Sequence, residues 1–177
     1  ESMLRECLAM GADEAVLVSA REFGGADTYA TSSTLTAAIR KIGVEEGDIV
    51  FCGRQAIDGD TAQVGPQIAE KLNIPQVTYV TAIDYKDGEL TVRRELEDGY
   101  MTIKVKTPCL LTCIKALNTP RYLSVSGIMA CSSTPYTVWD FTALSAATPI
   151  PVPHVGLPAS TPPRHTSFPP PRPRPAP

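Results

Sequence analysis

Helical segments and short apolar runs alternate along the first half of the chain, and this alternation limits the fold more than any other feature. Short apolar runs separated by helices indicate strands of an open parallel sheet with right-handed crossovers. Ligands in such folds bind at the carboxyl ends of the strands. The expected helices span 2–10, 32–42 and 66–72, and the expected strands span 15–19, 48–52 and 76–81.

The next part of the chain changes to a pattern of antiparallel strands. Three segments, 78–85, 89–96 and 100–106, are rich in β-branched and aromatic residues. They are separated by Asp-Gly pairs at 87–88 and 98–99, and such pairs favour tight hairpin turns. We therefore expect an antiparallel β meander attached to the parallel sheet.

One more buried strand is expected over 108–112, and a long loop then runs from 118 to 137. Regular structure is expected to end after 138–141. The whole pattern predicts an α/β fold with a parallel sheet, an antiparallel meander and an extended carboxyl-terminal arm. Because the sheet starts on a helix and few parallel strands precede the meander, we expect it to be incomplete at its amino end.

The composition excludes several classes of function. The chain has 19 acidic and 16 basic residues, and every acidic residue lies within 1–150, which argues against a nucleic-acid-binding protein. No apolar run approaches the roughly 20 residues that span a bilayer. The amino-terminal segment lacks the basic and apolar regions of a signal peptide. We therefore expect a cytoplasmic protein with no membrane insertion.

No residue is assigned as catalytic or as a metal ligand. The five cysteines are scattered and lie mostly in apolar sequence, which is typical of reduced thiols in a core. Cys109 and Cys113 have a spacing that could suit a metal, but a structural zinc site needs a second pair of ligands. His154 and His165 lie in a proline-rich tail and are expected to be solvated.

The segment GRQAIDGDTAQVGPQ at 53–67 is the strongest candidate for a ligand site. Pro66 has no N–H, so the following helix starts no earlier than about 62–63, and the residues before it form a loop. Gly53, Gly59 and Gly65 would let the backbone approach a ligand closely. The N–H groups of about 61–65 would then bind a phosphate or pyrophosphate at the helix amino terminus.

Two carboxylates in this loop would repel such a ligand. We expect Asp58 and Asp60 to cap backbone donors or to face a ribose hydroxyl, with Arg54 offsetting their charge. From the residues alone, an ordinary strand-to-helix connection stays open as the alternative.

Four blocks of the sequence, in the order of the family, resemble the beta subunit of electron-transfer flavoproteins. The resemblance implies an adenine-nucleotide α-hydrolase-like fold that binds a nucleotide without hydrolysing it. The implied protein is an electron carrier rather than an enzyme. It pairs with an alpha subunit and passes electrons between a dehydrogenase or NADH and a redox partner. The blocks are LAMGADEAVLVS at 8–19, FGGADTYATS at 23–32, AIDGDTAQVGPQIAEKL at 56–72 and LNTPRYLSVSGIM at 117–129.

The implied cofactor is FAD, with AMP as the alternative. Most beta subunits of the family hold AMP, whereas those of the electron-bifurcating group hold a second FAD, and FGGADTYAT is similar to that group. Helix capping by Asp27 or Thr31 is the alternative role for the first loop. The implied cofactor contacts are Gly25, Ala26, Asp27, Thr28 and Thr31 in the first loop, and Asp58, Gly59, Asp60, Thr61, Ala62, Gln63, Val64 and Gly65 in the second.

The block at 117–129 resembles the family's recognition loop for acyl-CoA dehydrogenases or related flavoproteins. An apolar residue anchors that loop, and Val125 is at the aligned position, with Tyr122 and Leu123 beside it. A plain surface loop is the alternative. The family also begins with a strand and a nucleotide-contacting loop that this sequence does not contain, so the adenine side of the pocket is expected to be incomplete.

Three parts of the chain are expected. Residues 1–116 form a partial nucleotide-binding domain with the meander, 117–150 a recognition loop and arm, and 151–177 a proline-rich extended tail. Two other functions stay open. One is an inactive or non-redox nucleotide-binding protein of the same fold. The other is an ATP-using enzyme of that fold, for which the chain lacks a glycine- and serine-rich pyrophosphate loop.

Overall fold

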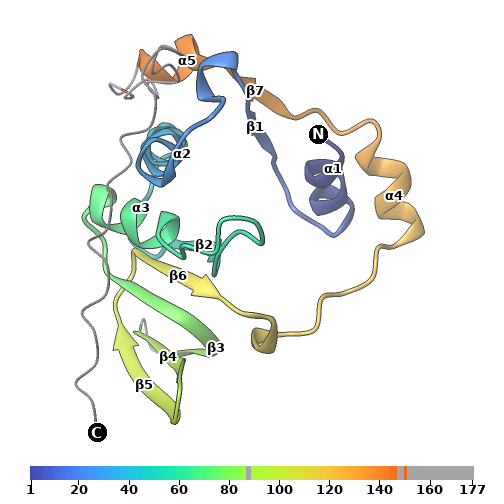
Figure 1. Cartoon of the computed structure of the whole chain (residues 1–177). Coiled ribbons are helices and arrows are strands. Elements are labelled where there is room, and N and C mark those ends of the chain that lie inside the picture. The colour runs from blue at the N-terminus through green and yellow to red at the C-terminus, as the bar shows by residue number, and fades with distance from the viewer. Residues whose placement is uncertain (87–88, 147–149, 151–177) are drawn as a thin grey trace, which may run out of the picture.

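The computed structural model describes residues 1–86, 89–146 and 150 (Figure 1). Its main sheet has five strands in the order β2-β6-β3-β4-β5. The first three strands of this order run parallel, and β3, β4 and β5 form an antiparallel meander. The predicted class, α/β with parallel and antiparallel strands, is therefore confirmed. The strands are β2 (Ile49–Gly53), β3 (Gln76–Lys86), β4 (Glu89–Leu96), β5 (Gly99–Val105) and β6 (Cys109–Cys113).

The first strand, β1 (Val16–Val18), does not belong to the main sheet. It pairs in parallel with β7 (Thr137–Trp139) in a separate two-stranded sheet. Our prediction that 15–19 joins the main parallel sheet was therefore wrong. An apolar run favours a strand, but its partner here comes from more than 100 residues later in the chain, and no local pattern encodes that pairing.

Two helices lie beside the main sheet, and local signals decide where each begins. α2 (Thr28–Ile42) starts before the expected residue 32, because the Asp27 carboxylate accepts a hydrogen bond from Ala30 N at 2.8 Å. α3 (Val64–Leu72) starts after 62–63, as Pro66 required. It ends at Asn73, whose φ of 56° lies in the left-handed region common at helix ends.

The strand β6 lies at the centre of the core and is buried on both faces. Leu110 packs with Ile68 and Ala69 of α3 on one face. Leu111 packs on the other face in a cluster with residues of the meander, such as Val80. The expected buried strand over 108–112 is thus confirmed, and it holds the meander and α3 together.

The segment expected as a long loop over 118–137 contains a helix, α4 (Val125–Cys131). A further helix, α5 (Phe141–Ser145), follows β7, where regular structure was expected to end. Each helix has a capping side chain: Ser124 Oγ accepts from Gly127 N at 2.9 Å, and Asp140 Oδ1 accepts from Ala143 N at 2.7 Å. Both helices are too short for apolar periodicity to predict them.

The second hairpin turn lies one residue earlier than expected. Leu96 pairs with Gly99, so Glu97 and Asp98 form the turn and Gly99 begins β5. The other predicted turn at 87–88, the two histidines and the tail 151–177 lie outside the described residues.

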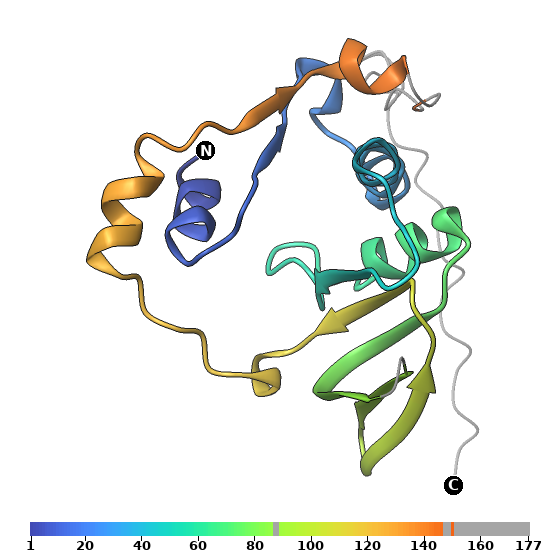
Figure 2. The same cartoon turned by 180° about the vertical axis from the view of Figure 1, so that it is seen from behind.

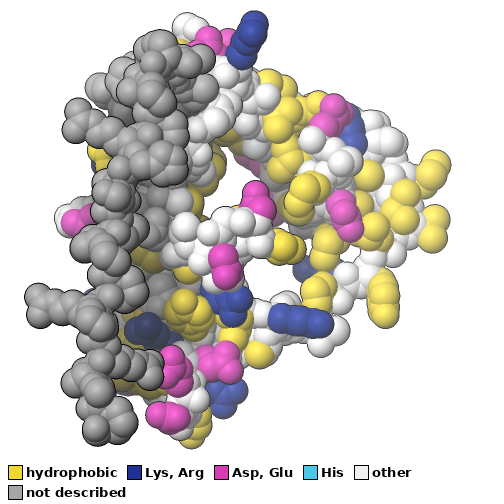
Figure 3. Space-filling view, in the orientation of Figure 1, with side chains coloured by type: hydrophobic (Ala, Val, Ile, Leu, Met, Phe, Trp, Pro, Cys, Tyr) yellow, Lys and Arg dark blue, Asp and Glu magenta, His cyan; other side chains and the backbone are white. Residues whose placement is uncertain are grey.

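The elements follow one another around a ring in both views of the molecule (Figures 1 and 2). The β1–β7 pair lies opposite the five-stranded sheet, and α1 (Ser2–Ala9) with α4 lies opposite α2 and α3. Apolar side chains are visible over the outer side of α4 (Figure 3). In the described part of the chain, no helix has the length and apolar character needed to cross a membrane.

Candidate functional site

A cleft of about 570 Å³ opens beyond the carboxyl end of β2, between the start of α2 and the loop that joins β2 to α3. Its size is ordinary for a small-molecule site. The cleft brings together the two loops that were predicted to contact a cofactor. All of the predicted cofactor residues line it except Gly25 and Asp60. The lining residues among those predicted are Ala26, Asp27, Thr28, Thr31, Asp58, Gly59, Thr61, Ala62, Gln63, Val64 and Gly65.

A hydrogen bond joins the two loops across the cleft. Thr28 Oγ1, on the first residue of α2, donates to Gln63 Oε1 at 3.0 Å. Gln63 is the residue immediately before α3. The two helix amino termini are therefore held side by side, although 35 residues separate them in the chain.

The amino termini of α2 and α3 differ in how many backbone N–H groups are left free to bind a ligand. Asp27 caps α2, so the capping role proposed for this residue is real, and its carboxylate also lines the cleft. Gln63 makes no side-chain cap on α3, and the first backbone bond of α3 runs from Gln67 N to Gln63 O. The N–H groups of Val64 and Gly65 precede that bond, and the positive end of the helix dipole lies at the same place. α3 therefore offers the better site for an anion.

The loop before α3 contains strained backbone. Asp60 and Ala62 have φ values of 51° and 52°, in the left-handed region that residues other than glycine rarely adopt. Each such residue costs about 1–3 kcal/mol and persists only where the surrounding structure imposes it. This strain marks the loop as a candidate functional segment, although Asp60 itself does not line the cleft.

The glycines of the loop have different roles. A Cβ on Gly65 would lie 2.7 Å from Thr112 Cγ2 of β6, so this glycine allows α3 to pack closely on the sheet. A Cβ on Gly53 or Gly59 would meet nothing within 4 Å. We predicted that Gly53, Gly59 and Gly65 would each let a ligand approach the backbone closely. Gly53 and Gly59 have the free space for such an approach, whereas Gly65 is needed for the packing of α3 on β6.

Of the acidic side chains in the two loops, Asp27 makes a hydrogen bond within the described residues, whereas Asp58 and Asp60 make none through their side chains. Asp58 is exposed and lines the cleft with Arg54. Within residues 1–86 and 89–146, neither Asp58 nor Asp60 caps a backbone donor through its side chain, and neither pairs with Arg54. The capping that we expected of Asp58 and Asp60 is therefore not seen in this part of the chain, and Asp58 can face a ligand hydroxyl, which was the other role expected.

A lysine on α3, Lys71, forms contacts with the first turns of α2. Lys71 Nζ donates to Tyr29 O at 3.1 Å and to Ser32 Oγ, and it stands 4.0 Å from the centre of the Tyr29 ring. Burial lowers the pKa of Lys71, and the nearby charge of Asp27 opposes this shift. Sequence reasoning missed Lys71 because its partners lie about 40 residues away.

The predicted partner segment is exposed on α4 and just before it. Tyr122 is 98% exposed, Val125 79% and Leu123 38%. Ile128 and Met129 are exposed as well and were missed by the sequence analysis. They follow Val125 by three and four residues, so all three side chains lie on one face of the helix.

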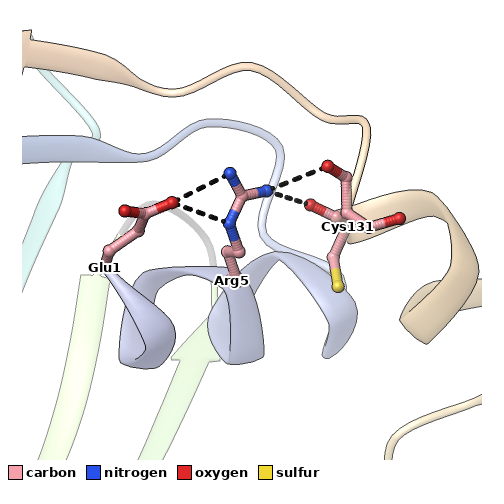
Figure 4. A network of polar contacts seen from close by, with 4 residues as sticks. Glu1, Arg5 and Cys131 are labelled. Carbon is pink, nitrogen blue, oxygen red and sulfur yellow. Dashed lines mark hydrogen bonds and ion pairs between the residues drawn. The ribbon is translucent and has the colours of Figure 1, made fainter.

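Helix α1 supports α4 from the inner side. Arg5 Nη1 donates to Cys131 O at 2.8 Å and to Ser132 O at 3.2 Å, while its other nitrogens bind Glu1 (Figure 4). A Cβ on Gly127 would lie 2.3 Å from Ala9 O, so the two helices touch through their backbones. The part of the predicted partner segment that lies in α4 is therefore a supported helix rather than a loop.

Metal ligation has no support in the part of the chain that the structure describes. These residues contain no group of three or more His, Cys, Asp or Glu side chains placed to hold a metal ion. The five cysteines are free thiols.

The model of the electron transfer flavoprotein domain matches residues 1–144. The chain belongs to the electron transfer flavoprotein family. The resemblance found in the four sequence blocks is thereby confirmed, and the two loops of the cleft lie within the matched part of this electron transfer flavoprotein domain.

Three relatives illustrate the similarity of other proteins to this electron transfer flavoprotein domain. Acryloyl-CoA reductase electron transfer subunit gamma of Anaerotignum propionicum is 58% identical over 175 residues, covering 97% of this chain and 65% of the relative. Caffeyl-CoA reductase-Etf complex subunit CarD of Acetobacterium woodii is 62% identical over 138 residues, covering 78% and 52%. Electron transfer flavoprotein subunit beta of Thermoanaerobacterium thermosaccharolyticum is 65% identical over 128 residues, covering 72% and 48%. The chain thus spans about half to two thirds of the length of these relatives.

Proposed function

We propose that this chain acts as the beta-type part of an electron transfer flavoprotein and holds FAD, or alternatively AMP, in the cleft between α2 and α3. The observation that carries the proposal is the convergence of two separate loops on one cleft, joined by the bond from Thr28 to Gln63. Both loops come from sequence blocks that resemble the beta subunit.

The chemistry of the cleft fits an adenine nucleotide. The free N–H groups at the start of α3 suit a phosphate or pyrophosphate. Three hydroxyl side chains, Thr28, Thr31 and Thr61, line the same cleft. Thr31 and Thr61 can donate to phosphate or ribose oxygens, whereas Thr28, which donates to Gln63, can accept from a ribose hydroxyl. The Asp58 carboxylate can accept from a ribose hydroxyl, and the positively charged Arg54 lines the same cleft. FAD, when bound, supplies the redox chemistry, and the protein binds and orients it.

The names of the relatives support a role inside a larger complex. Two of them are subunits of acryloyl-CoA reductase and of a caffeyl-CoA reductase-Etf complex. We infer that this chain pairs with an alpha subunit and passes electrons between NADH or a dehydrogenase and an acyl-CoA dehydrogenase or related flavoprotein. The exposed side chains Tyr122, Leu123 and Val125 suit the docking of that redox partner.

The test is to co-express the chain with an alpha subunit, purify the complex and measure its flavin spectrum, FAD content and AMP content. Two FAD molecules per heterodimer support the FAD form, and one FAD with one AMP supports the AMP form. Gly59→Leu fills the cleft from a position with open space around its Cβ. This variant should lose the nucleotide bound in the cleft, whereas Glu70→Leu on the exposed surface of α3 should keep it.

Two outcomes would contradict the proposal. One is a wild-type complex with neither a second FAD nor AMP. The other is a Gly59→Leu complex with the same nucleotide content as the wild type.

A further inference from the structure

The charged side chains of the cleft limit how many phosphate groups a ligand can bring to it. Among the residues that line the cleft, Asp27 and Asp58 are acidic and Arg54 is basic, so the lining has a net negative charge. Its best place for an anion is the start of α3, where the N–H groups of Val64 and Gly65 are free. The cleft can therefore hold one phosphate or pyrophosphate group at that helix, but it has little positive charge left for another.

The amino terminus of α2 does not offer a second phosphate site. Asp27 Oδ1 accepts from Ala30 N at 2.8 Å, so a carboxylate already occupies this end of the helix. The Thr28 hydroxyl donates to Gln63 and is not free to donate to a ligand. Lys71 Nζ donates to other groups of α2, and Lys71 does not line the cleft. A phosphate placed beside α2 would thus meet the charge of Asp27.

Asp58 is the acidic side chain of the cleft that the protein leaves free. It is exposed, and within residues 1–86 and 89–146 its carboxylate makes no hydrogen bond and no ion pair. In dinucleotide-binding folds, an acidic side chain that accepts from a ribose hydroxyl selects against a phosphate at that hydroxyl, whereas an arginine can accommodate the phosphate. The cleft contains both residue types, in Asp58 and Arg54, so the balance between them decides which nucleotides can bind.

The balance favours the carboxylates. Two carboxylates face one guanidinium in the lining, and the exposed Arg54 makes no ion pair with either of them within the described residues. In a nucleotide held by its 5′-phosphate at α3, the ribose hydroxyls point away from that phosphate and into the rest of the cleft. Two like charges about 6 Å apart near a protein surface repel by an amount that corresponds to roughly 100-fold in affinity.

We propose that Asp58 makes the cleft selective for adenine nucleotides that carry phosphate at the 5′ position alone, as AMP and FAD do. Nucleotides with a further phosphate on the ribose, as in coenzyme A and NADP, are excluded. The inference rests on the proposed function, because it takes an adenine nucleotide as the ligand of the cleft.

The experiment uses the complex with the alpha subunit, freed of the nucleotide in the cleft. Calorimetric titration compares 5′-AMP with adenosine 2′,5′-bisphosphate and adenosine 3′,5′-bisphosphate. We expect the wild type to bind 5′-AMP about 30-fold or more tightly than either bisphosphate. Asp58→Asn removes the charge and keeps an oxygen that can accept from a hydroxyl, so it should lower this ratio of affinities by about fivefold or more.

Asp60→Asn is the matched control. It makes the same change of charge two residues away, on a side chain that does not line the cleft, and should alter the ratio by less than about twofold. Asp58→Lys should reverse the selectivity, so that the bisphosphates bind at least as tightly as 5′-AMP. Added salt should lower the wild-type ratio because it screens repulsion, whereas a purely steric effect of Asp58 would not respond to salt.

Thermal unfolding of each variant complex controls for misfolding, and the salt series on the wild type tests the inference without any variant. The inference is overturned if the wild type binds 5′-AMP and the bisphosphates equally tightly, in which case Arg54 accommodates the ribose phosphate and the proposed function stands. It is also overturned if Asp58→Asn and Asp60→Asn change the ratio equally. A wild-type complex that binds none of the three nucleotides, and no FAD in the cleft, overturns both proposals.

Discussion

The Thr28 hydroxyl donates to the side-chain oxygen of Gln63 at 3.0 Å and so joins the amino termini of α2 and α3. This one bond spans the cleft in which we place the nucleotide. It connects the two sequence blocks that resemble the cofactor loops of the family, and it lies where a phosphate would bind. A variant that lacks this bond therefore tests the geometry of the cleft with little change in the stability of the fold.

Thr28→Val should weaken nucleotide binding with little effect on folding. A single neutral hydrogen bond contributes about 0.5–1.5 kcal/mol, which corresponds to about 2- to 10-fold in affinity. Calorimetric titration with FAD and with AMP measures the effect. Ser33→Ala, which removes another hydroxyl of α2 that bonds only to Tyr29 O, is the matched control and should leave affinity unchanged. Equal affinities for wild type and Thr28→Val would mean that the bond does not shape the site.

Gly65→Ala should destabilise the protein. The new methyl group would lie 2.7 Å from Thr112 Cγ2, so α3 must move away from β6. Overpacking of this kind costs about 1–3 kcal/mol of unfolding free energy. Gly59→Ala in the same loop meets nothing within 4 Å and should be near neutral.

The same clash can be relieved from the opposite side. Thr112→Ser removes the methyl group and keeps the hydroxyl that accepts from Tyr79 N. The double variant Gly65→Ala/Thr112→Ser should therefore recover much of the stability lost in Gly65→Ala. Denaturant unfolding of the four proteins gives the coupling energy. A coupling near zero would show that the two groups do not meet in solution.

Stability should fall above about pH 9. Burial raises the pKa of the thiols of Cys52, Cys109 and Cys113 above the ordinary value of 9.0, and the neighbouring Cys113 adds to the shift of Cys52. Between the unfolded and folded pKa values, the folded state holds more protons than the unfolded state, so stability is complete below pH 9 and decreases as pH rises. Unfolding midpoints from pH 7 to pH 11 measure this. Cys109→Ala should lose part of the alkaline decrease, whereas Cys7→Ala, at an exposed position, should keep it.

Arg5→Leu should loosen α4 from α1. The guanidinium bonds to Cys131 O and Ser132 O are made by a partly buried charged donor, and their loss should cost about 1.5–3 kcal/mol. Hydrogen exchange of the amides in α4 should become faster. Glu1→Gln removes only an exposed ion pair with Arg5 and should change exchange little. Unchanged exchange in Arg5→Leu would show that the backbone contact at Gly127 is sufficient to hold the helix.

Local signals in the sequence determined most of the elements and the loops of the cleft. Apolar runs marked the strands, Pro66 marked the start of α3, and alternation with helices marked the parallel sheet. The cofactor residues were expected from the resemblance of the two loops to the family, and they stay a prediction. Local features showed only where each helix begins, through the Asp27 cap and Pro66.

Tertiary structure alone decided how these elements pair. β1 pairs with β7 rather than with the main sheet, α4 is a helix because α1 covers its inner face, and Gly65 is required by Thr112 of another element. Each of these relationships joins residues far apart in the chain. Side-chain fit and strand pairing at such separations depend on the whole packed core, and no periodicity within a segment can specify them.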